Sequence, residues 1–228
     1  MNITELKSGR KIHFYKRVFI ILVAGLILSC EPSVYFLSPQ PAGIKNLPEI
    51  PREYAGSYFN TKDSTLLFIS SDQLIHRETD YSIMTREKLY EEIDTVIDHD
   101  TLVYAAPNWT VEINLIGDSA EYISKTIDTL YLSGPENYIR KWHDFLFLNM
   151  KTDEGKWTVY ILKKNDTQLF FDELLKSSEV DTVKTIVEIT PVIDTVENKI
   201  TEYYLCPSKK ELLGILKNKK VSYDYLKQ

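Results

Sequence analysis

The chain has 228 residues, of which 26% are charged and 43% hydrophobic, a balance typical of one globular domain with or without appendages. The formal net charge is −6, but residues 1–29 hold five of the 27 basic residues and one of the 33 acidic residues. Without them the charge is −10, which argues against binding to nucleic-acid phosphates and against electrostatic attachment to anionic lipid.

The first 29 residues have the layout of a signal peptide. Residues 1–17 are basic, and residues 18–28 form an unbroken apolar run, VFIILVAGLIL. A spanning helix needs roughly 20 apolar residues, so this shorter run fits a cleaved signal better than a permanent anchor. Ile27-Leu28-Ser29-Cys30 resembles the lipobox of bacterial lipoproteins, with an aliphatic residue three before Cys and a small residue directly before it. The resemblance implies cleavage after Ser29 and acylation of Cys30 with a diacylglyceryl group and a further acyl chain such as palmitate.

The lipobox resemblance also indicates in which membrane of the cell envelope the protein is anchored. Many Gram-negative bacteria retain a lipoprotein in the inner membrane when Asp follows the lipidated Cys, whereas Glu31 follows Cys30 in this chain. We therefore expect the protein to be attached to the outer membrane, on either its periplasmic or its surface face. An uncleaved anchor with an incidental Cys30 is the alternative. If Cys30 is acylated, Cys206 is the one remaining thiol, so we expect no internal disulfide.

Residues 30–52 are predicted to be a lipidated, proline-rich tether, and residues 53–228 a single β-rich domain. Five of the nine prolines lie in this segment, and proline favours extended, semi-rigid backbone of about 3 Å per residue. The apolar run at residues 34–37 is an exception, because it is unfavourable in water. We expect it to pack on the domain or to rest at the lipid interface.

The domain alternates short apolar stretches with polar turns, which is typical of an antiparallel β meander. Val111, Ile113 and Leu115 are apolar and the residues between them are polar, which predicts a strand with one buried face. Turn residues lie at 98–100, 152–155, 165–166 and 197–198. The predicted strands are 57–60, 65–70, 73–78, 95–97, 101–105, 110–116, 121–124, 129–132, 144–151, 157–164, 168–171, 182–189 and 200–205.

Helices are predicted to be few and short. Capping boxes of the form S-x-x-E at residues 133–136 and 208–211 indicate two helix starts, and the second opens an apolar C-terminal stripe. Residues 85–92 are a third candidate. None of these helices suits repeated crossovers, so the predicted class is mainly β. We expect the meander to close into a barrel or form a strongly curled sheet, with a two-sheet sandwich as the alternative.

Aromatic residues are dense in the second half of the chain. Barrels of this size commonly enclose a cavity, so these side chains are candidates for lining a ligand pocket. Packing in an ordinary core is the alternative and the more common role of such residues. The candidate ligand-cavity residues are Trp142, Phe145, Phe147, Trp157 and Tyr160.

An Asp followed by Ser or Thr and then by an aliphatic or small residue recurs six times. Turn formation explains the pattern, because Asp bonds the backbone of a turn and a β-branched residue opens the next strand. The tripeptide also resembles the O-glycosylation motif that one group of Gram-negative bacteria uses on exported proteins. The acceptors that this resemblance implies are Thr95, Thr101, Ser119, Thr129, Thr182 and Thr195.

The sequence contains no G-x-S-x-G, H-E-x-x-H or C-x-x-C motif and no glycine-rich phosphate loop. Its four histidines are dispersed, and Asp98-His99-Asp100 fits a solvated turn better than a set of metal ligands. We expect no catalytic residue, metal site or cofactor, and a binding protein is favoured over an enzyme.

Segments 30–36, 54–58, 147–151 and 207–216 resemble those of uncharacterised outer-membrane lipoproteins of Gram-negative bacteria, a resemblance that implies no activity. The predicted function is a lipid-anchored, non-enzymatic β domain that binds a small apolar ligand, a glycan or an envelope protein. A structural lipoprotein of an outer-membrane complex and an unrecognised hydrolase are the alternatives.

Overall fold

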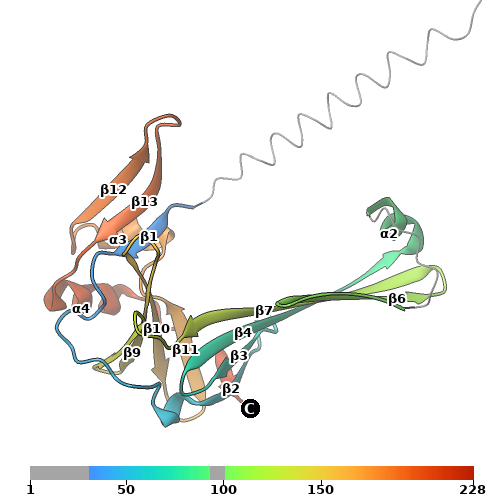
Figure 1. Ribbon diagram of the computed structural model, residues 1–228, viewed down its shortest axis with the longest axis horizontal. Coiled ribbons are helices and arrows are strands. Elements are labelled where there is room, and N and C mark those ends of the chain that lie inside the picture. Colours follow the sequence, from blue (N-terminus) through green and yellow to red (C-terminus); the bar gives the residue numbers. More distant parts are fainter. Residues whose placement is uncertain (1–30, 93–100) are drawn as a thin grey trace, which may run out of the picture.

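The computed structural model describes residues 31–92 and 101–228, which form mainly β structure with short helices. Within these residues 14 strands join one open sheet, in the order β12-β13-β1-β10-β11-β14-β2-β3-β4-β7-β6-β5, with β9 and β8 branching from β10 (Figure 1). The pairs are antiparallel except for β1 beside β13. The predicted mainly β class is therefore confirmed. Of the two arrangements predicted first, a closed barrel and a strongly curled sheet, the closed barrel is wrong.

The elements have the following bounds. The strands are β1 (Ser33–Phe36), β2 (Gly56–Asn60), β3 (Leu66–Ile69), β4 (Gln73–Thr85), β5 (Thr101–Ala106), β6 (Trp109–Ile116), β7 (Ser119–Leu132), β8 (Tyr138–Trp142), β9 (Phe145–Lys151), β10 (Trp157–Lys164), β11 (Gln168–Glu173), β12 (Ile189–Asp194), β13 (Lys199–Leu205) and β14 (Tyr225–Lys227). The helices are α2 (Arg86–Glu92), α3 (Val180–Val183) and α4 (Lys209–Asn218), with 3-10 turns η1 (Arg52–Tyr54) and η2 (Ser177–Glu179). No helix among the described residues is long and apolar enough to cross a membrane.

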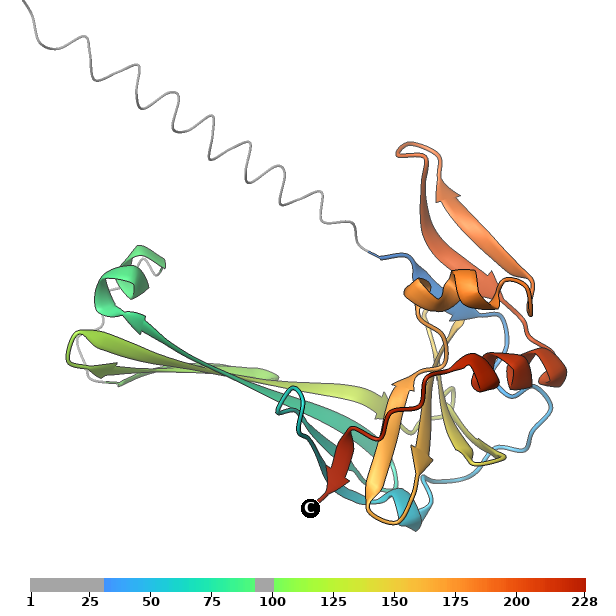
Figure 2. The same ribbon diagram turned by 180° about the vertical axis from the view of Figure 1, so that it is seen from behind.

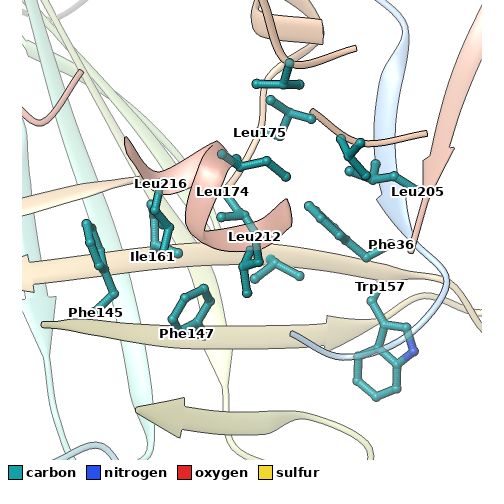
Figure 3. Packing of buried hydrophobic residues seen from close by; sticks show 14 of the residues in the cluster. Phe36, Phe145, Phe147, Trp157, Ile161, Leu174, Leu175, Leu205, Leu212 and Leu216 are labelled. Carbon is teal, nitrogen blue, oxygen red and sulfur yellow. The ribbon is translucent and has the colours of Figure 1, made fainter. Parts of the chain in front are cut away.

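The body of the molecule has apolar cores on both sides of β9 and β10. In β9, Phe145 and Phe147 belong to a first core with α4 (Figure 3). Leu146 and Leu148 belong to a second core with β2 and β3. A strand that is buried on both faces has a continuous apolar sequence, which explains the run FLFL. The predicted strands at 144–151 and 157–164 are confirmed at this centre.

Two of the three helix predictions are confirmed. Helix α2 lies within the predicted 85–92, and α4 begins after Ser208, which forms the predicted capping box with Glu211. The helix start predicted from the capping box at residues 133–136 is wrong, because Gly134 and Asn137 pair in a turn between β7 and β8. The predicted strand at 182–189 is also wrong. Val180, Val183 and Val187 follow helical spacing and enter the first core from α3 and the turn after it.

The segment from Glu31 to Arg52 differs from the predicted tether, because it is part of the body. Strand β1 lies between β13 and β10 with Phe36 1% exposed, and Val34 packs on the same core. Arg140 donates hydrogen bonds to the Pro41 carbonyl oxygen and to Asn46 Oδ1, both at 2.8 Å. The prolines therefore lie in a packed connection instead of a spacer. For the apolar run at residues 34–37 two positions were predicted, and the structure shows the first of them, packing on the domain.

A long arm leaves the body (Figures 1 and 2). Strand β4 pairs with β7 along its whole length but with β3 only as far as Arg77, so the two strands continue beyond the body. Strands β6 and β5 widen the arm and α2 lies at its end. The sequence predicted β4 to end at Glu78 and β7 to be two short strands. The polar residues that suggested those breaks are exposed within continuous strands.

Candidate binding surface

One face of the arm is covered by α2. Residues directly opposite each other in antiparallel strands share a face, so Met84 and Ala120 point to the same side. Leu89 of α2 packs there against Val111, Ile113 and Ala120, and is 1% exposed. This small core fixes α2 on one side of the sheet, which we call the covered face.

The opposite side, which we call the bare face, has no element packed on it within the described residues and presents large apolar side chains to solvent. The register places Tyr81 opposite Ile123 and Ile83 opposite Glu121, on the side away from Met84. The exposed fractions are 62% for Ile83, 58% for Ile116 and 57% for both Tyr81 and Val103. Exposed apolar patches of this kind mark interaction sites on soluble proteins. No motif in the sequence pointed to this surface.

The bare face continues onto the outer side of the body. There Phe68 lies opposite Ile75, and Phe59 lies opposite Leu66, in the β2-β3-β4 part of the sheet. These four side chains are partly exposed and belong to none of the three buried cores. Leu226 of β14, opposite Phe59, is 41% exposed. The apolar surface therefore extends from the tip of the arm to the body.

Charged groups are unevenly distributed along the bare face of the arm. Glu112 and Glu121 lie towards the tip, whereas Arg77 and Lys125 lie towards the body. Glu121 accepts a hydrogen bond of 2.9 Å from Tyr81 Oη, which raises the pKa of Tyr81. Glu112 Oε1 accepts one of 3.1 Å from an Asn114 amide. Arg77 and Lys125 are exposed and form no ion pair among the described residues.

The five predicted ligand-cavity aromatics lie in cores. Phe145, Phe147 and Trp157 are at most 8% exposed in the first core (Figure 3). Trp142 packs against this core. Tyr160 belongs to the second core, where its ring stacks on Phe171 with centroids 5.3 Å apart. Since β9 and β10 separate the two cores, the structure does not bring these five residues around one cavity.

The described residues also form open pockets, of which one lies beside β1 and another beside α4. The first, of about 390 Å³, is lined by Glu31, Tyr35, Glu173 and Lys176 among others. Burial raises the pKa of the Glu173 carboxyl. The second, of about 250 Å³, lies between α3 and α4 and includes Lys219. The second pocket is smaller than the roughly 300–1,000 Å³ of drug-sized ligand sites, and the first lies at the low end of that range.

The predicted glycosylation acceptors are mostly accessible. Thr101, Thr129, Thr182 and Thr195 are exposed and Ser119 is partly buried, while Thr95 lies outside the described residues. At one copy of the motif the turn explanation is seen directly, because the Asp194 carboxylate accepts hydrogen bonds from the backbone N–H groups of Val196 and Glu197. These bonds lower the pKa of Asp194.

Within residues 31–92 and 101–228, no three His, Cys, Asp or Glu side chains come together in a group that could hold a metal ion. Cys30 and the turn at 98–100 lie outside the described residues. The structure thus offers the bare face as its most distinctive chemical feature. Comparisons with protein-family models, curated proteins and solved structures return no match to this chain.

Proposed function

We propose that the protein is a lipid-anchored, non-enzymatic lipoprotein of the outer membrane that binds a protein partner through the bare face of its arm. The observation that carries this proposal is the row of apolar side chains on that face, with Tyr81, Ile83, Ile116 and Val103 each more than half exposed. Leaving such residues in water is unfavourable by about 25 cal/mol for each Å² of apolar surface. A partner that covers this face would remove that surface from water.

The position of the anchor supports the same proposal. Ser177 Oγ donates a hydrogen bond of 2.8 Å to Glu31, and β1 begins at Ser33, so the chain joins the body directly after position 30. Acyl chains on Cys30 would hold the body close to the bilayer. The arm belongs to the other end of the strand order, where β5 is the last strand. Anchoring and binding would then use different parts of one rigid sheet.

The position of the aromatic residues favours a protein partner over a small apolar ligand. A cavity for such a ligand requires side chains that face a common space, whereas Phe147 and Leu146 point to opposite sides of β9 into filled cores. The bare face is instead broad and exposed, like the surfaces that proteins recognise.

Site-specific photo-cross-linking tests the proposed binding surface. Benzoylphenylalanine at Tyr81, on the bare face, is expected to yield a protein adduct in cells of the native host. The matched control is Trp109, an exposed aromatic that lies opposite Thr126 and therefore on the covered face. We expect the adduct at Tyr81 to be at least several-fold more abundant on a gel. Equal yields, or no adduct from Tyr81, would contradict the proposal.

The anchor is tested in the same cells. Labelled fatty acid should enter the wild-type chain but not Cys30→Ala, and the variant should move from the membrane to the soluble fraction. Incorporation of label into both proteins would show that Cys30 is not the anchor, without affecting the result for the arm.

A further inference from the structure

We propose that the partner on the bare face is a second copy of this chain, so that two arms pack face to face in opposite directions as a two-fold dimer. This inference rests on the proposed function, because it uses the same surface and names the occupant. Three observations support it: the order of charges along the arm, the size of the face, and the charges that exclude other occupants.

The order of charges is the first argument. Along β7 the residues on the bare face are Glu121, Ile123, Lys125 and Ile127, running from the tip towards the body. On the neighbouring strands Glu112 is level with Ile123, and Arg77 is level with Ile127. The half of the face nearer the tip is therefore acidic and the half nearer the body is basic.

A face with this arrangement is complementary to itself in one orientation. If two copies pack with their arms in opposite directions, the acidic half of each lies against the basic half of the other. If the arms ran in the same direction, acidic groups would face acidic groups, at a cost of several kcal/mol. A two-fold interface requires such self-complementarity, since each contact is made twice. Arg77 and Lys125, which lack ion-pair partners within the described residues, would gain them from the second copy.

The size of the face is the second argument. The arm is four strands wide, and β4 continues from Glu78 to Thr85 beyond its pairing with β3. At about 4.8 Å between strands and 3.3 Å per residue, this gives a face of roughly 500 Å². Two copies would bury about 1,000 Å², the size at which a specific protein interface is expected to begin. The continuation onto Phe68 and Ile75 adds apolar area where the tip of the second arm would lie.

The apolar side chains also suit the packing of two sheets. Stacked sheets lie about 10 Å apart with their strands tilted by about 30°, an angle that arises from the twist of each sheet. Branched and aromatic side chains such as Ile83, Ile116 and Tyr81 fill a layer of that thickness. The covered face cannot form the same layer at the tip, because α2 occupies it.

The exclusion of other occupants is the third argument. The chain after residue 29 has a net charge of −10, so an anionic lipid surface would repel it. A strongly basic partner would leave Arg77 and Lys125 unpaired and facing like charge. A second copy satisfies both halves of the bare face at once.

Paired charge reversals test this dimer in the full chain, extracted from membranes in mild detergent. The acidic variant carries Arg77→Glu and Lys125→Glu, and the basic variant carries Glu112→Lys and Glu121→Lys. We expect wild-type protein to sediment as a concentration-dependent dimer. Each variant alone should dissociate roughly tenfold or more readily, whereas an equimolar mixture of the two should form a one-to-one heterodimer. Recovery in the mixture also shows that both variants are folded.

The matched control reverses charges on the covered face. Glu78 and Asp80 lie on β4 beside the residues already changed, are exposed, and point to the other side. Glu78→Lys with Asp80→Lys should dimerise like the wild type. A wild-type chain that stays monomeric at the highest concentration, or variants that dimerise undiminished, would overturn the inference. A Tyr81 adduct with a different protein, together with a monomeric wild type, would overturn the dimer but keep the proposed function.

Discussion

Replacing Phe36 with Ala is expected to lower the free energy of unfolding by about 3–5 kcal/mol, the usual cost of truncating a buried aromatic side chain. Phe36 is 1% exposed and lies in the first core, with Trp157 as its partner in β10 (Figure 3). The loss combines the apolar surface returned to water with the cavity that the rigid strands around it cannot close. If residues 30–52 were a flexible tether, the same substitution would have almost no effect.

Leu37→Ala is the matched control, because Leu37 is the next residue and is 57% exposed. Its effect is expected to stay within about 0.5 kcal/mol. Urea unfolding followed by tryptophan fluorescence measures both variants. If Phe36→Ala fails to fold, Phe36→Leu keeps most of the volume and should cost less than the Ala substitution. Equal and small effects of Phe36→Ala and Leu37→Ala would show that β1 is not part of the stable body.

The local parts of this fold could be predicted from the sequence. The hairpin of β9 and β10 follows from an apolar run, a turn containing Gly155 and a second apolar run. Helix α4 follows from Ser208 and Glu211, whose side chains satisfy the first free N–H groups of the helix. In each case the residues that decide the structure are close together in the sequence.

The placement of β1 could not be predicted in this way. It pairs in parallel with β13, and Val34 has its partner at Tyr203, far away in the sequence. Nothing in the local pattern names that partner, and five prolines nearby favour an extended spacer. The packing decides the outcome, because the apolar side chains of Val34 and Phe36 have a core available to them.

The bare face was missed for a related reason. Apolar residues in a strand are usually taken as buried, so Ile83 and Ile116 do not stand out in the sequence. In addition, Glu78, Thr79 and Asp80 suggested the end of a strand, whereas they lie in the exposed middle of β4. A buried face can be inferred from periodicity, but an exposed apolar face needs the three-dimensional neighbours to be known.

Replacing Lys219 with Met is expected to cost about 3–5 kcal/mol, although the two side chains have similar length. The Lys219 side chain is 2% exposed, and its Nζ lies 2.7 Å from Glu179 and 3.0 Å from Asp172. These contacts tie the end of α4 to η2 and β11. Removing the ammonium group leaves the partly buried Glu179 carboxylate without its lysine and Asp172 with Lys176 alone. An uncompensated carboxylate there costs more than the ion pairs themselves contribute.

Lys220→Met is the matched control, because Lys220 is adjacent and exposed, and its effect is expected within about 0.5 kcal/mol. A triple variant separates the unpaired carboxylates from the lost ion pairs. When Lys219→Met is combined with Asp172→Asn and Glu179→Gln, both carboxylates that faced Lys219 are neutral. Lys176 loses Asp172 as its partner but is 48% exposed, so much of the lost stability should return in urea unfolding. A triple variant as unstable as Lys219→Met alone would mean that the loss of the ion pairs themselves, and not the unpaired carboxylates, accounts for the cost. Since α4 packs on the first core, the contacts of the Lys219 ammonium group would then be what fixes this side of the body.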